Sequence, residues 1–206
     1  MIVVVTAMDK EYNLIEKWLE KSEVSDVTLI KTGIGKVNAA STLSEFLVST
    51  KGVDKVLSVG CAGAAISELK VGNIVIGNSY CYHDVYCGEQ NANGQVQGMP
   101  AVFPSDFTSL KEPERFTFGT IVTGDWFVTT REKVESIKNF LPASYNVCAI
   151  DMESAALAQV CYKKNIPFTS IRVISDNPLL PNQDTQYQGF WDDMADKAFQ
   201  TLTELL

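Results

Sequence analysis

The sequence predicts an α/β fold: a three-layer αβα sandwich with a mixed, mostly parallel central sheet. Short β-branched runs alternate along the chain with segments of helical periodicity, which is the pattern of a parallel sheet covered by helices. The chain has 206 residues, of which 46% are hydrophobic and 20% charged, enough for a substantial core. No linker rich in Pro, Gly or Ser divides it, so residues 1–206 are expected to form one domain.

The first part of the chain predicts three strands and two helices. Residues 2–5 form a β-branched run typical of a buried strand, and residues 9–20 carry an apolar stripe at helical spacing. A second strand through Ile30 leads into a tight turn at Gly33 and Gly35, followed by a helix from about Val37. A third strand begins near residue 53 and is expected to run into a turn at Gly60 and Gly63.

The second part continues the alternation. Strands are predicted within residues 71–84 and 119–125, on either side of a polar segment at residues 90–113. A small, apolar helix is predicted at residues 152–164, then a strand at residues 168–176, and finally an amphipathic helix at residues 190–206.

Composition excludes several classes of protein. The net charge of −8 argues against a nucleic-acid partner, because phosphate backbones favour clustered Lys and Arg. The apolar opening is far shorter than the roughly 20 residues that span a bilayer, and it lacks the features of a signal peptide. The five scattered cysteines indicate reduced thiols in a cytoplasmic protein. With a single histidine and no CxxC pair, we expect neither a metal site nor an organic cofactor.

Three acidic residues could converge: Glu11 follows the first predicted strand, Glu153 stands at the entrance of a predicted helix, and Asp176 ends the last predicted strand. Ligands of open α/β sheets bind at the carboxyl ends of the strands, where Glu11, Glu153 and Asp176 are expected. Structural alternatives remain open: Glu11 suits a helix first turn, and Asp176 precedes a turn-forming Asn-Pro. Asp151 is best interpreted as a helix N-cap. Glu153 stands before an Ala-rich helix, where burial without a ligand would be costly.

Taken in order, a series of segments resembles the purine nucleoside phosphorylase superfamily, and within it the 5'-methylthioadenosine/S-adenosylhomocysteine nucleosidases. The segments are TAMDKE, KTGIGKVNAA, SVGCAGA, VGNIVI, YHD, TGDWF, DMESAALA and IRVISD. They span nearly the whole chain, and AMDKE is the segment that points to the nucleosidase branch. The resemblance implies hydrolysis of an N-ribosidic bond, with release of adenine and a 5-substituted ribose.

The resemblance also implies roles for individual residues. Glu11 would activate the attacking water, Glu153 would bind the ribose 2'- and 3'-hydroxyls, and Asp176 would protonate purine N7. Further substrate contacts are implied for Met8, Ile34, Cys61, Ala62, Gly63, Phe127, Val128, Met152, Arg172, Ser175 and Phe190. Pro100 and Phe103 resemble a segment lent to a partner subunit's site, which implies a homodimer.

Several functions are compatible with this pattern. A phosphorylase of this superfamily would need an arginine-bearing anion loop after the first strand, but residues 6–11 contain two acids and no arginine. A phosphorylase, a hydrolase of a related purine nucleoside such as futalosine, and a non-catalytic nucleoside-binding protein stay as alternatives. Cys61 replaces the usual serine of the nucleosidases, and the preference for the 5'-substituent is left open.

Overall fold

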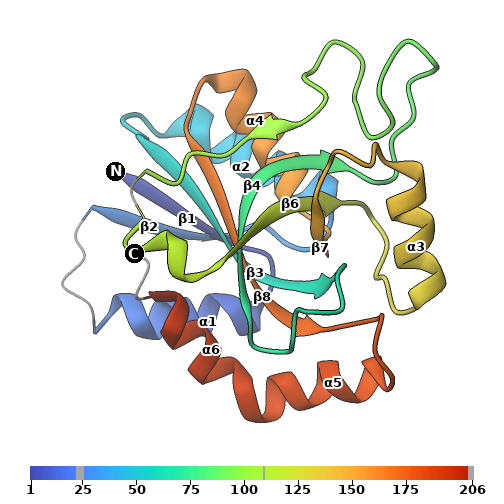
Figure 1. Cartoon of the computed structure of the whole chain (residues 1–206). Coiled ribbons are helices and arrows are strands. Elements are labelled where there is room, and N and C mark those ends of the chain that lie inside the picture. The colour runs from blue at the N-terminus through green and yellow to red at the C-terminus, as the bar shows by residue number, and fades with distance from the viewer. Residues whose placement is uncertain (22–25, 109, 204–206) are drawn as a thin grey trace.

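A computed structural model describes residues 1–21, 26–108 and 110–203 of the chain, and its centre is one mixed sheet (Figure 1). The strand order is β2-β1-β3-β7-β6-β4-β5, and β8 pairs with both β3 and β4. The strands are β1 (Ile2–Thr6), β2 (Val27–Lys31), β3 (Lys55–Ala64), β4 (Ile74–Tyr82), β5 (Phe103–Pro104), β6 (Thr117–Thr123), β7 (Val147–Asp151) and β8 (Phe168–Asp176).

Most strand pairs are parallel, as the alternation of strands and helices predicts. β1 runs parallel to β2 and β3, β3 to β8, and β6 to both β4 and β7. The antiparallel pairs are β3 with β7, β4 with β5, and β4 with β8. The carboxyl ends of β1, β3, β7 and β8 consequently lie near one another, and this is where the functional residues gather.

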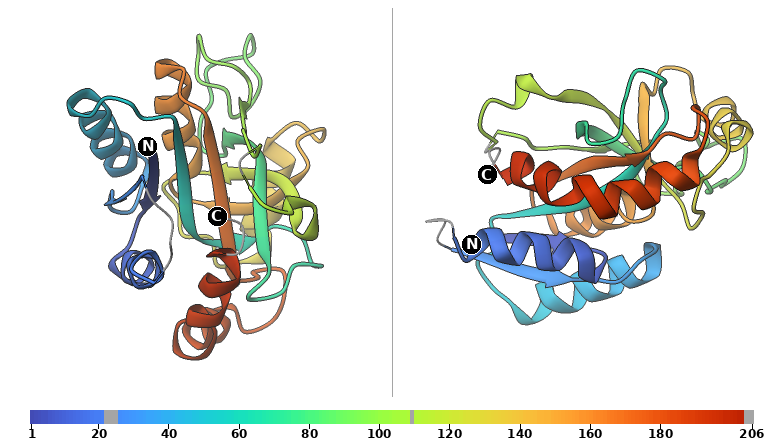
Figure 2. Two further views of the ribbon diagram at one scale, coloured as in Figure 1. Left: turned by 90° about the vertical axis from the view of Figure 1, so that its left-hand side faces the viewer. Right: turned by 90° about the horizontal axis from the view of Figure 1, so that it is seen from below.

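Helices cover the sheet on two sides, which confirms the three-layer arrangement (Figures 1 and 2). The helices are α1 (Asp9–Leu19), α2 (Lys36–Ser49), α3 (Arg131–Phe140), α4 (Ser154–Lys164), α5 (Gln183–Gly189) and α6 (Ala195–Thr203). One face buries small and branched side chains of α2 and α4, such as Ala39, Leu43 and Leu157. The opposite face buries Ile15 of α1 and Phe199 of α6. Within the described residues, no helix has both the length and the apolar character to cross a membrane.

The strand β3 corrects one prediction, because it does not turn at Gly60 or Gly63. Both glycines lie within the strand, and the lack of a side chain at Gly60 leaves room for a carboxylate. A Cβ atom at Gly60 would lie 2.7 Å from Oε1 of Glu11, and one at Gly63 would lie 3.5 Å from Oδ2 of Asp176. Glycine in this strand therefore marks a close approach of side chains to the backbone, not a reversal of the chain.

Other elements differ in extent from those expected. The strand β7 and the helix α3 were not predicted, and α4 begins at Ser154, two residues after the expected start. The helix predicted at residues 190–206 begins as one π-helical turn at Phe190–Met194 before α6, and α5, which precedes it, was not predicted. The last three residues of that predicted helix lie outside the described part of the chain.

Candidate active site

A cavity opens at the carboxyl ends of β1, β3, β7 and β8, and all three predicted acids line it. The residues around it are Ala7, Met8, Glu11, Ile34, Cys61, Ala62, Gly63, Trp126, Phe127, Val128, Ile150, Asp151, Met152, Glu153, Ser175, Asp176, Pro178 and Tyr187. Glu11, Glu153 and Asp176 are each less than 10% exposed, although they come from distant parts of the chain. A shared hollow lined by three buried carboxylates is an arrangement that stability alone does not favour.

Glu11 is fixed by backbone groups. Its Oε2 accepts hydrogen bonds from the backbone N–H of Ala7 at 3.0 Å and of Met8 at 3.1 Å, and its Oε1 accepts one from that of Cys61 at 2.8 Å. The bond to Met8 spans three residues at the start of α1, so the same carboxylate also serves the helix N-terminus. Burial raises the pKa of Glu11, while Arg172 and these three N–H groups oppose the rise.

Cys61 contributes to this arrangement through its main chain. The bond to Glu11 comes from the backbone N–H, so it does not depend on whether residue 61 is serine or cysteine. Burial raises the pKa of the Cys61 thiol well above its usual value, and the nearby Glu11 carboxylate adds to the rise. The thiol therefore stays protonated at neutral pH and is a poor nucleophile.

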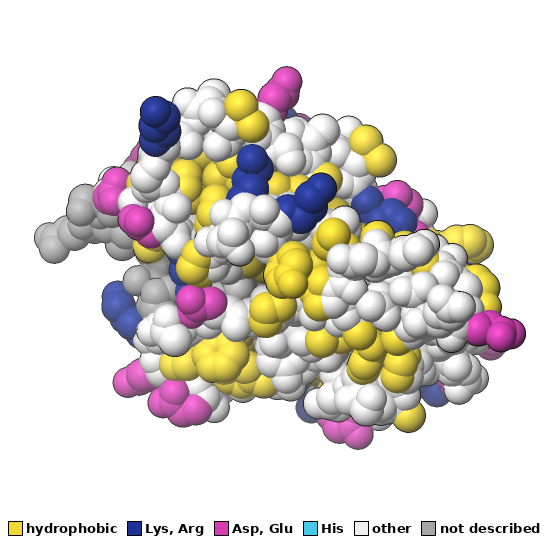
Figure 3. Space-filling model, turned by 90° about the horizontal axis from the view of Figure 1, so that it is seen from above, with side chains coloured by type: hydrophobic (Ala, Val, Ile, Leu, Met, Phe, Trp, Pro, Cys, Tyr) yellow, Lys and Arg dark blue, Asp and Glu magenta, His cyan; other side chains and the backbone are white. Residues whose placement is uncertain are grey.

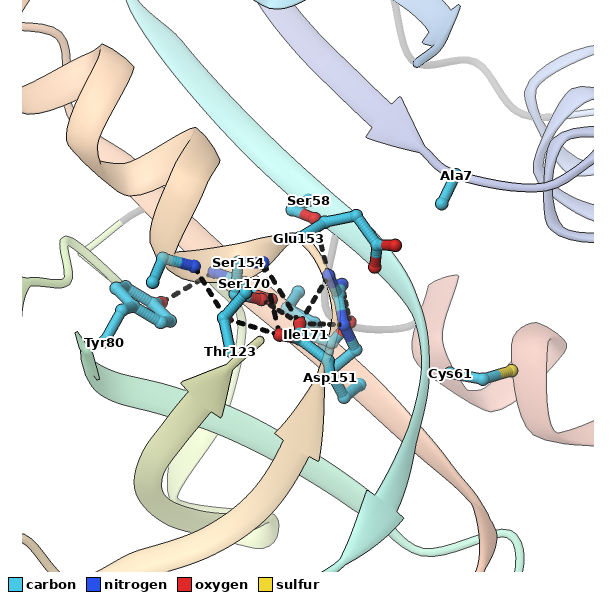
Figure 4. Close-up of polar contacts among 12 residues, drawn as sticks. Ala7, Ser58, Cys61, Tyr80, Thr123, Asp151, Glu153, Ser154, Ser170 and Ile171 are labelled. Carbon is cyan, nitrogen blue, oxygen red and sulfur yellow. Dashed lines mark hydrogen bonds and ion pairs between the residues drawn. The ribbon is translucent and has the colours of Figure 1, made fainter. Parts of the chain in front are cut away.

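Glu153 lies just before α4 and faces the turn that follows β2. Its Oε1 accepts a hydrogen bond from the backbone N–H of Gly35 at 3.0 Å, and Gly35 holds a φ of 94° that favours glycine. Burial, followed by the neighbouring Asp151, raises the pKa of Glu153 to about 8. In Figure 4 its carboxylate points away from Asp151, towards the side on which Ala7 and Cys61 lie.

Asp151 lies at the cavity wall, and its carboxylate belongs to a buried polar cluster (Figure 4). Its carboxylate forms an ion pair with Arg172 at 2.9 Å and accepts a hydrogen bond from Thr123 Oγ1 at 2.6 Å. It also accepts a bond from the backbone N–H of Ser154 at 3.2 Å, so it acts on the first residue of α4 much as a cap would. Arg172 donates a further bond to Ser58 Oγ at 3.0 Å.

Asp176, at the end of β8, is held by side chains. Ser175 Oγ donates to its Oδ1 at 2.7 Å, and Gln183 Nε2 from α5 donates to its Oδ2 at 2.7 Å. Burial raises the pKa of Asp176, and the two hydrogen bonds oppose this rise. A raised pKa is the condition under which a carboxyl group can still hold a proton near neutrality.

The mouth of the cavity is aromatic. Trp126 and Phe127 come from the loop after β6 and are 57% and 52% exposed, which leaves flat apolar surface available to a ligand. Phe127 meets the ring of Tyr187 edge-on, with ring centroids 5.3 Å apart. Tyr187 and Trp126 were not among the predicted contacts. Trp126 precedes Phe127 in the TGDWF segment, so its position could have been anticipated.

The structure corrects the expected position of Phe190. This side chain is fully buried in the core against Ile15 and Phe199, and it does not line the cavity. Tyr187, three residues earlier in α5, occupies the cavity wall instead. Arg172 also stays behind the cavity, in its ion pair with Asp151, and does not line it.

Phe103 lies in the core of its own chain, and its contribution to a partner's site stays a prediction. Phe103 is 2% exposed and packs edge-on against Tyr82 and Tyr162 of its own chain. Its side chain therefore belongs to the core that supports α4. Pro100 is partly buried and does not line the cavity. The remaining predicted contacts, twelve in number with the three acids, all line it.

The cavity combines carboxyl groups with apolar surface and lacks cationic groups. Among the residues that line it, none is lysine or arginine. The described residues also contain no group of three or more His, Cys, Asp or Glu side chains that could hold a metal ion. Proton transfer and hydrogen bonding by carboxyl groups are thus the chemistry that these side chains offer.

Comparison with known proteins identifies the family. Residues 2–206 match the model of the phosphorylase superfamily. The chain belongs to the phosphorylase superfamily. It is 35% identical over 200 residues to the 5'-methylthioadenosine/S-adenosylhomocysteine nucleosidase of Geobacillus sp. (strain WCH70), and the match covers 85% of this chain and 84% of that one.

Solved structures within the superfamily agree with this assignment. The methylthioadenosine/S-adenosylhomocysteine nucleosidase of Streptococcus pneumoniae, in complex with 8-aminoadenine, superposes with a TM-score of 0.82 at 27% identity, covering 100% of this chain and 99% of that one. The corresponding nucleosidase of Neisseria meningitidis, in complex with methylthio-immucillin-A, gives a TM-score of 0.81 at 31% identity and covers 98% of both chains. These findings confirm the resemblance drawn from the sequence segments.

Proposed function

We propose that this protein is a nucleosidase that hydrolyses the N-ribosidic bond of 5'-methylthioadenosine, of S-adenosylhomocysteine, or of both, and releases adenine. The observation that carries the proposal is the convergence of Glu11, Glu153 and Asp176 on one cavity. Relatives named for this activity share the fold over nearly the whole chain. The proposal assigns each carboxyl group a separate task in breaking a sugar–base bond.

Asp176 is the proposed acid. Cleavage of the bond leaves electrons on the purine, and a proton delivered to N7 makes the base a better leaving group. Burial raises the pKa of Asp176, so the group can arrive protonated at the bound purine. Phe127 and Val128 line the same cavity and would bind the purine by stacking and by a main-chain contact.

Glu153 and Glu11 are proposed to act on the sugar. As the bond breaks, the ribose ring becomes positively charged, and a carboxylate beneath its hydroxyl groups both orients it and stabilises that charge. Glu153 has one oxygen bonded to Gly35 and lies beside Met152 on the cavity wall. Glu11 accepts the proton of the attacking water, in an arrangement related to that of inverting glycosidases.

Water is favoured over phosphate as the nucleophile. A phosphate ion needs cationic or N–H partners, yet the backbone N–H groups of Ala7, Met8 and Cys61 already bind Glu11. Arg172 is the cation nearest these groups in the described network, and Asp151 and Ser58 bind its guanidinium. A dianion beside the Glu11 carboxylate would therefore meet repulsion without compensation.

An assay with and without phosphate tests this function. Purified protein is mixed with 5'-methylthioadenosine in phosphate-free buffer, and adenine and the sugar product are measured by chromatography. We expect release of adenine at equal rates with and without phosphate, with free 5-methylthioribose as the second product. Release that requires phosphate would show a phosphorylase, and binding without turnover would show a nucleoside-binding protein.

We also propose that the protein forms a homodimer through the face of α2 and α4. A groove on this face is lined by Lys36, Val37, Ala40, Ser41, Ser44, Val48, Tyr82, Ala156, Gln159, Val160, Lys163 and Lys164. Val37 and Val48 are each 76% exposed there, and Figure 3 shows apolar side chains gathered over this side of the molecule. Exposed apolar surface of this kind favours a protein partner.

Sedimentation of single variants tests the dimer. The wild-type protein is expected at twice the chain mass of 22.7 kDa. Val48→Glu should shift it towards the monomer, because a buried unpaired charge opposes association. Leu180→Glu, at a 40% exposed position away from this face, is the matched control and should leave the mass unchanged. A monomeric wild-type protein would contradict the proposal.

The cytoplasm is the proposed location. All five cysteines carry free thiols, and three of them are buried. Such thiols persist in a reducing compartment. Fractionation of cells that express the protein would test this location directly.

A further inference from the structure

A second, smaller cavity adjoins the first, between residues of β1, β3 and β8 and the start of α4. It is lined by Val5, Thr6, Ala7, Glu11, Thr32, Ser58, Val59, Gly60, Glu153, Leu157 and Arg172. It shares Ala7, Glu11 and Glu153 with the main cavity, but none of the residues proposed to touch the purine. The side chains of Glu11 and Glu153 thus lie between the two cavities, one of which is the proposed substrate site.

Thr6 is the unexplained residue of the smaller cavity. It lies at the end of β1 and is 1% exposed, and its Oγ1 is buried without a hydrogen-bond partner among the described residues. The main chain of Thr6 is fixed, since its carbonyl oxygen accepts bonds from the backbone N–H of Thr32 at 2.9 Å and from Thr32 Oγ1 at 3.2 Å. A buried hydroxyl is ordinarily satisfied by protein or by ordered water.

We propose that this cavity holds one resident water molecule, positioned by Thr6, that bridges Glu11 and Glu153. The cavity volume is about 10 Å³, at the lower end of what a single water requires. Water has two hydrogens to donate, one for each carboxylate, and it can accept a hydrogen bond from the Thr6 hydroxyl. Three or four polar partners are typical of a buried water, and this lining supplies them.

The bridge would act on the acidity of the two carboxyl groups. The titratable groups that interact with one or the other are Arg172 from β8, Asp151 from β7, Cys61 from β3 and Tyr187 from α5. The cation among them, Arg172, is bonded to Asp151. A water that donates to both carboxylates favours their ionised forms and so helps Glu11 to remain a base. Thr6 is therefore a positioning residue, since it reaches the reaction through the water.

Thr6→Val tests the bridge, because valine keeps the shape of threonine and removes the hydroxyl. With the nucleosidase activity proposed above as readout, we expect the acid limb of the kcat/KM profile to move to higher pH by about half a unit, which costs about threefold in rate below the limb. Thr6→Ser, which restores a hydroxyl, should return the limb towards that of the wild type. Thr120→Val is the matched control: Thr120 is a buried threonine of β6 bonded to Ser79, away from both cavities, and its replacement should not move the limb.

A high-resolution crystal structure of the wild-type protein supplies a test that is independent of activity. It should show one water within hydrogen-bond distance of Thr6 Oγ1 and of both carboxylates, and the Thr6→Val structure should lack it. A dry cavity in the wild-type crystal, or an acid limb identical in wild type and Thr6→Val, would overturn the proposal. If the protein turns over no nucleoside, the proposed function fails, and the crystal structure alone decides the water site.

Discussion

Glu11 and Asp176 line one cavity and are held in contrasting ways. Glu11 accepts three hydrogen bonds, all from backbone N–H groups. Asp176 accepts two, both from the side chains of Ser175 and Gln183. The first acid is fixed by the path of the chain itself, whereas the second depends on two replaceable neighbours.

The contrast matches the proton each group must handle. A base must be ionised, and backbone N–H donors bind the ionised carboxylate whatever the side chains around it. An acid must hold its proton, and burial raises the pKa of Asp176 while two side chains moderate the rise. The chain can therefore adjust its acid by substitution, but it can adjust its base mainly by moving the backbone.

The largest effect is expected from Asp176→Asn, which removes the proton without changing the shape. We expect kcat to fall by about a thousandfold, within the range of general acid catalysis. The melting temperature should be retained, because an amide can still meet Ser175 and Gln183. Asp192→Asn, at an exposed acid, is the control and should leave kcat as it is. Turnover close to normal in Asp176→Asn would remove this residue from the mechanism.

Gly60→Ala should displace the Glu11 carboxylate while leaving residue 11 itself a glutamate. The added Cβ would lie 2.7 Å from Oε1, so the carboxylate must shift from the position in which it accepts its three N–H bonds. We expect kcat to fall by about a hundredfold, a loss similar to that of removing a positioned base. Gly189→Ala is the control, since a Cβ there meets nothing within 4 Å. Equal kcat values for the two alanine variants would show that Glu11 need not be fixed.

Gln183→Leu should change the acid in a graded way. Loss of the bond to Oδ2 lets burial raise the pKa of Asp176 further, so the protonated acid persists to higher pH. The basic limb of the kcat profile is then expected to move upward, by about one unit or less. Ser175→Ala should move it in the same direction. A basic limb that moves to lower pH in both variants would show that these hydrogen bonds do not lower the pKa of Asp176.

The smallest effect concerns stability, and it is set by Glu153. Its pKa in the folded protein is raised to about 8 from a usual value of 4.5, so the folded state binds its proton more tightly than the unfolded state does. Stability is therefore lost as pH rises from about 5 to about 8. We expect the melting temperature of the free protein to fall by a few degrees over this range and the slope to flatten in Glu153→Gln. A slope that is unchanged in the variant would assign the effect to other groups.

Periodicity predicted most of the fold. The β-branched runs at the start of β1 and along β8, and the Ala-rich helix α4, lie where the alternating pattern placed them. The turn at Gly33 and Gly35 was predicted from two glycines, and both hold positive φ angles. The convergence of the three acids was predicted because two of them lie at strand ends and Glu153 at a helix entrance of an open α/β sheet, where ligands bind.

What the sequence did not predict depends on contacts between distant residues. Gly60 and Gly63 look like turn residues until the carboxylates of Glu11 and Asp176 are placed against them. The assignment of Phe190 failed for a local reason: a π-helical turn begins there and changes which residues of the terminal segment face the cavity. The strand β7 has only five residues and directly precedes a helix, so it is recognised as a strand only from its pairing with β6. The helix α3 did carry a signal, since Thr130 accepts a bond from the backbone N–H of Lys133, as an N-cap does.

The construction of β3 has an evolutionary consequence. One wall of the cavity follows β3, where a Cβ atom at Gly60 would lie 2.7 Å from Oε1 of Glu11, so a side chain at that position would displace the proposed base. The rings of Trp126 and Tyr187 also line the cavity and are partly exposed. Substitutions that adapt the cavity to other nucleosides are therefore expected at those rings, whereas Gly60 and the three acids should be retained.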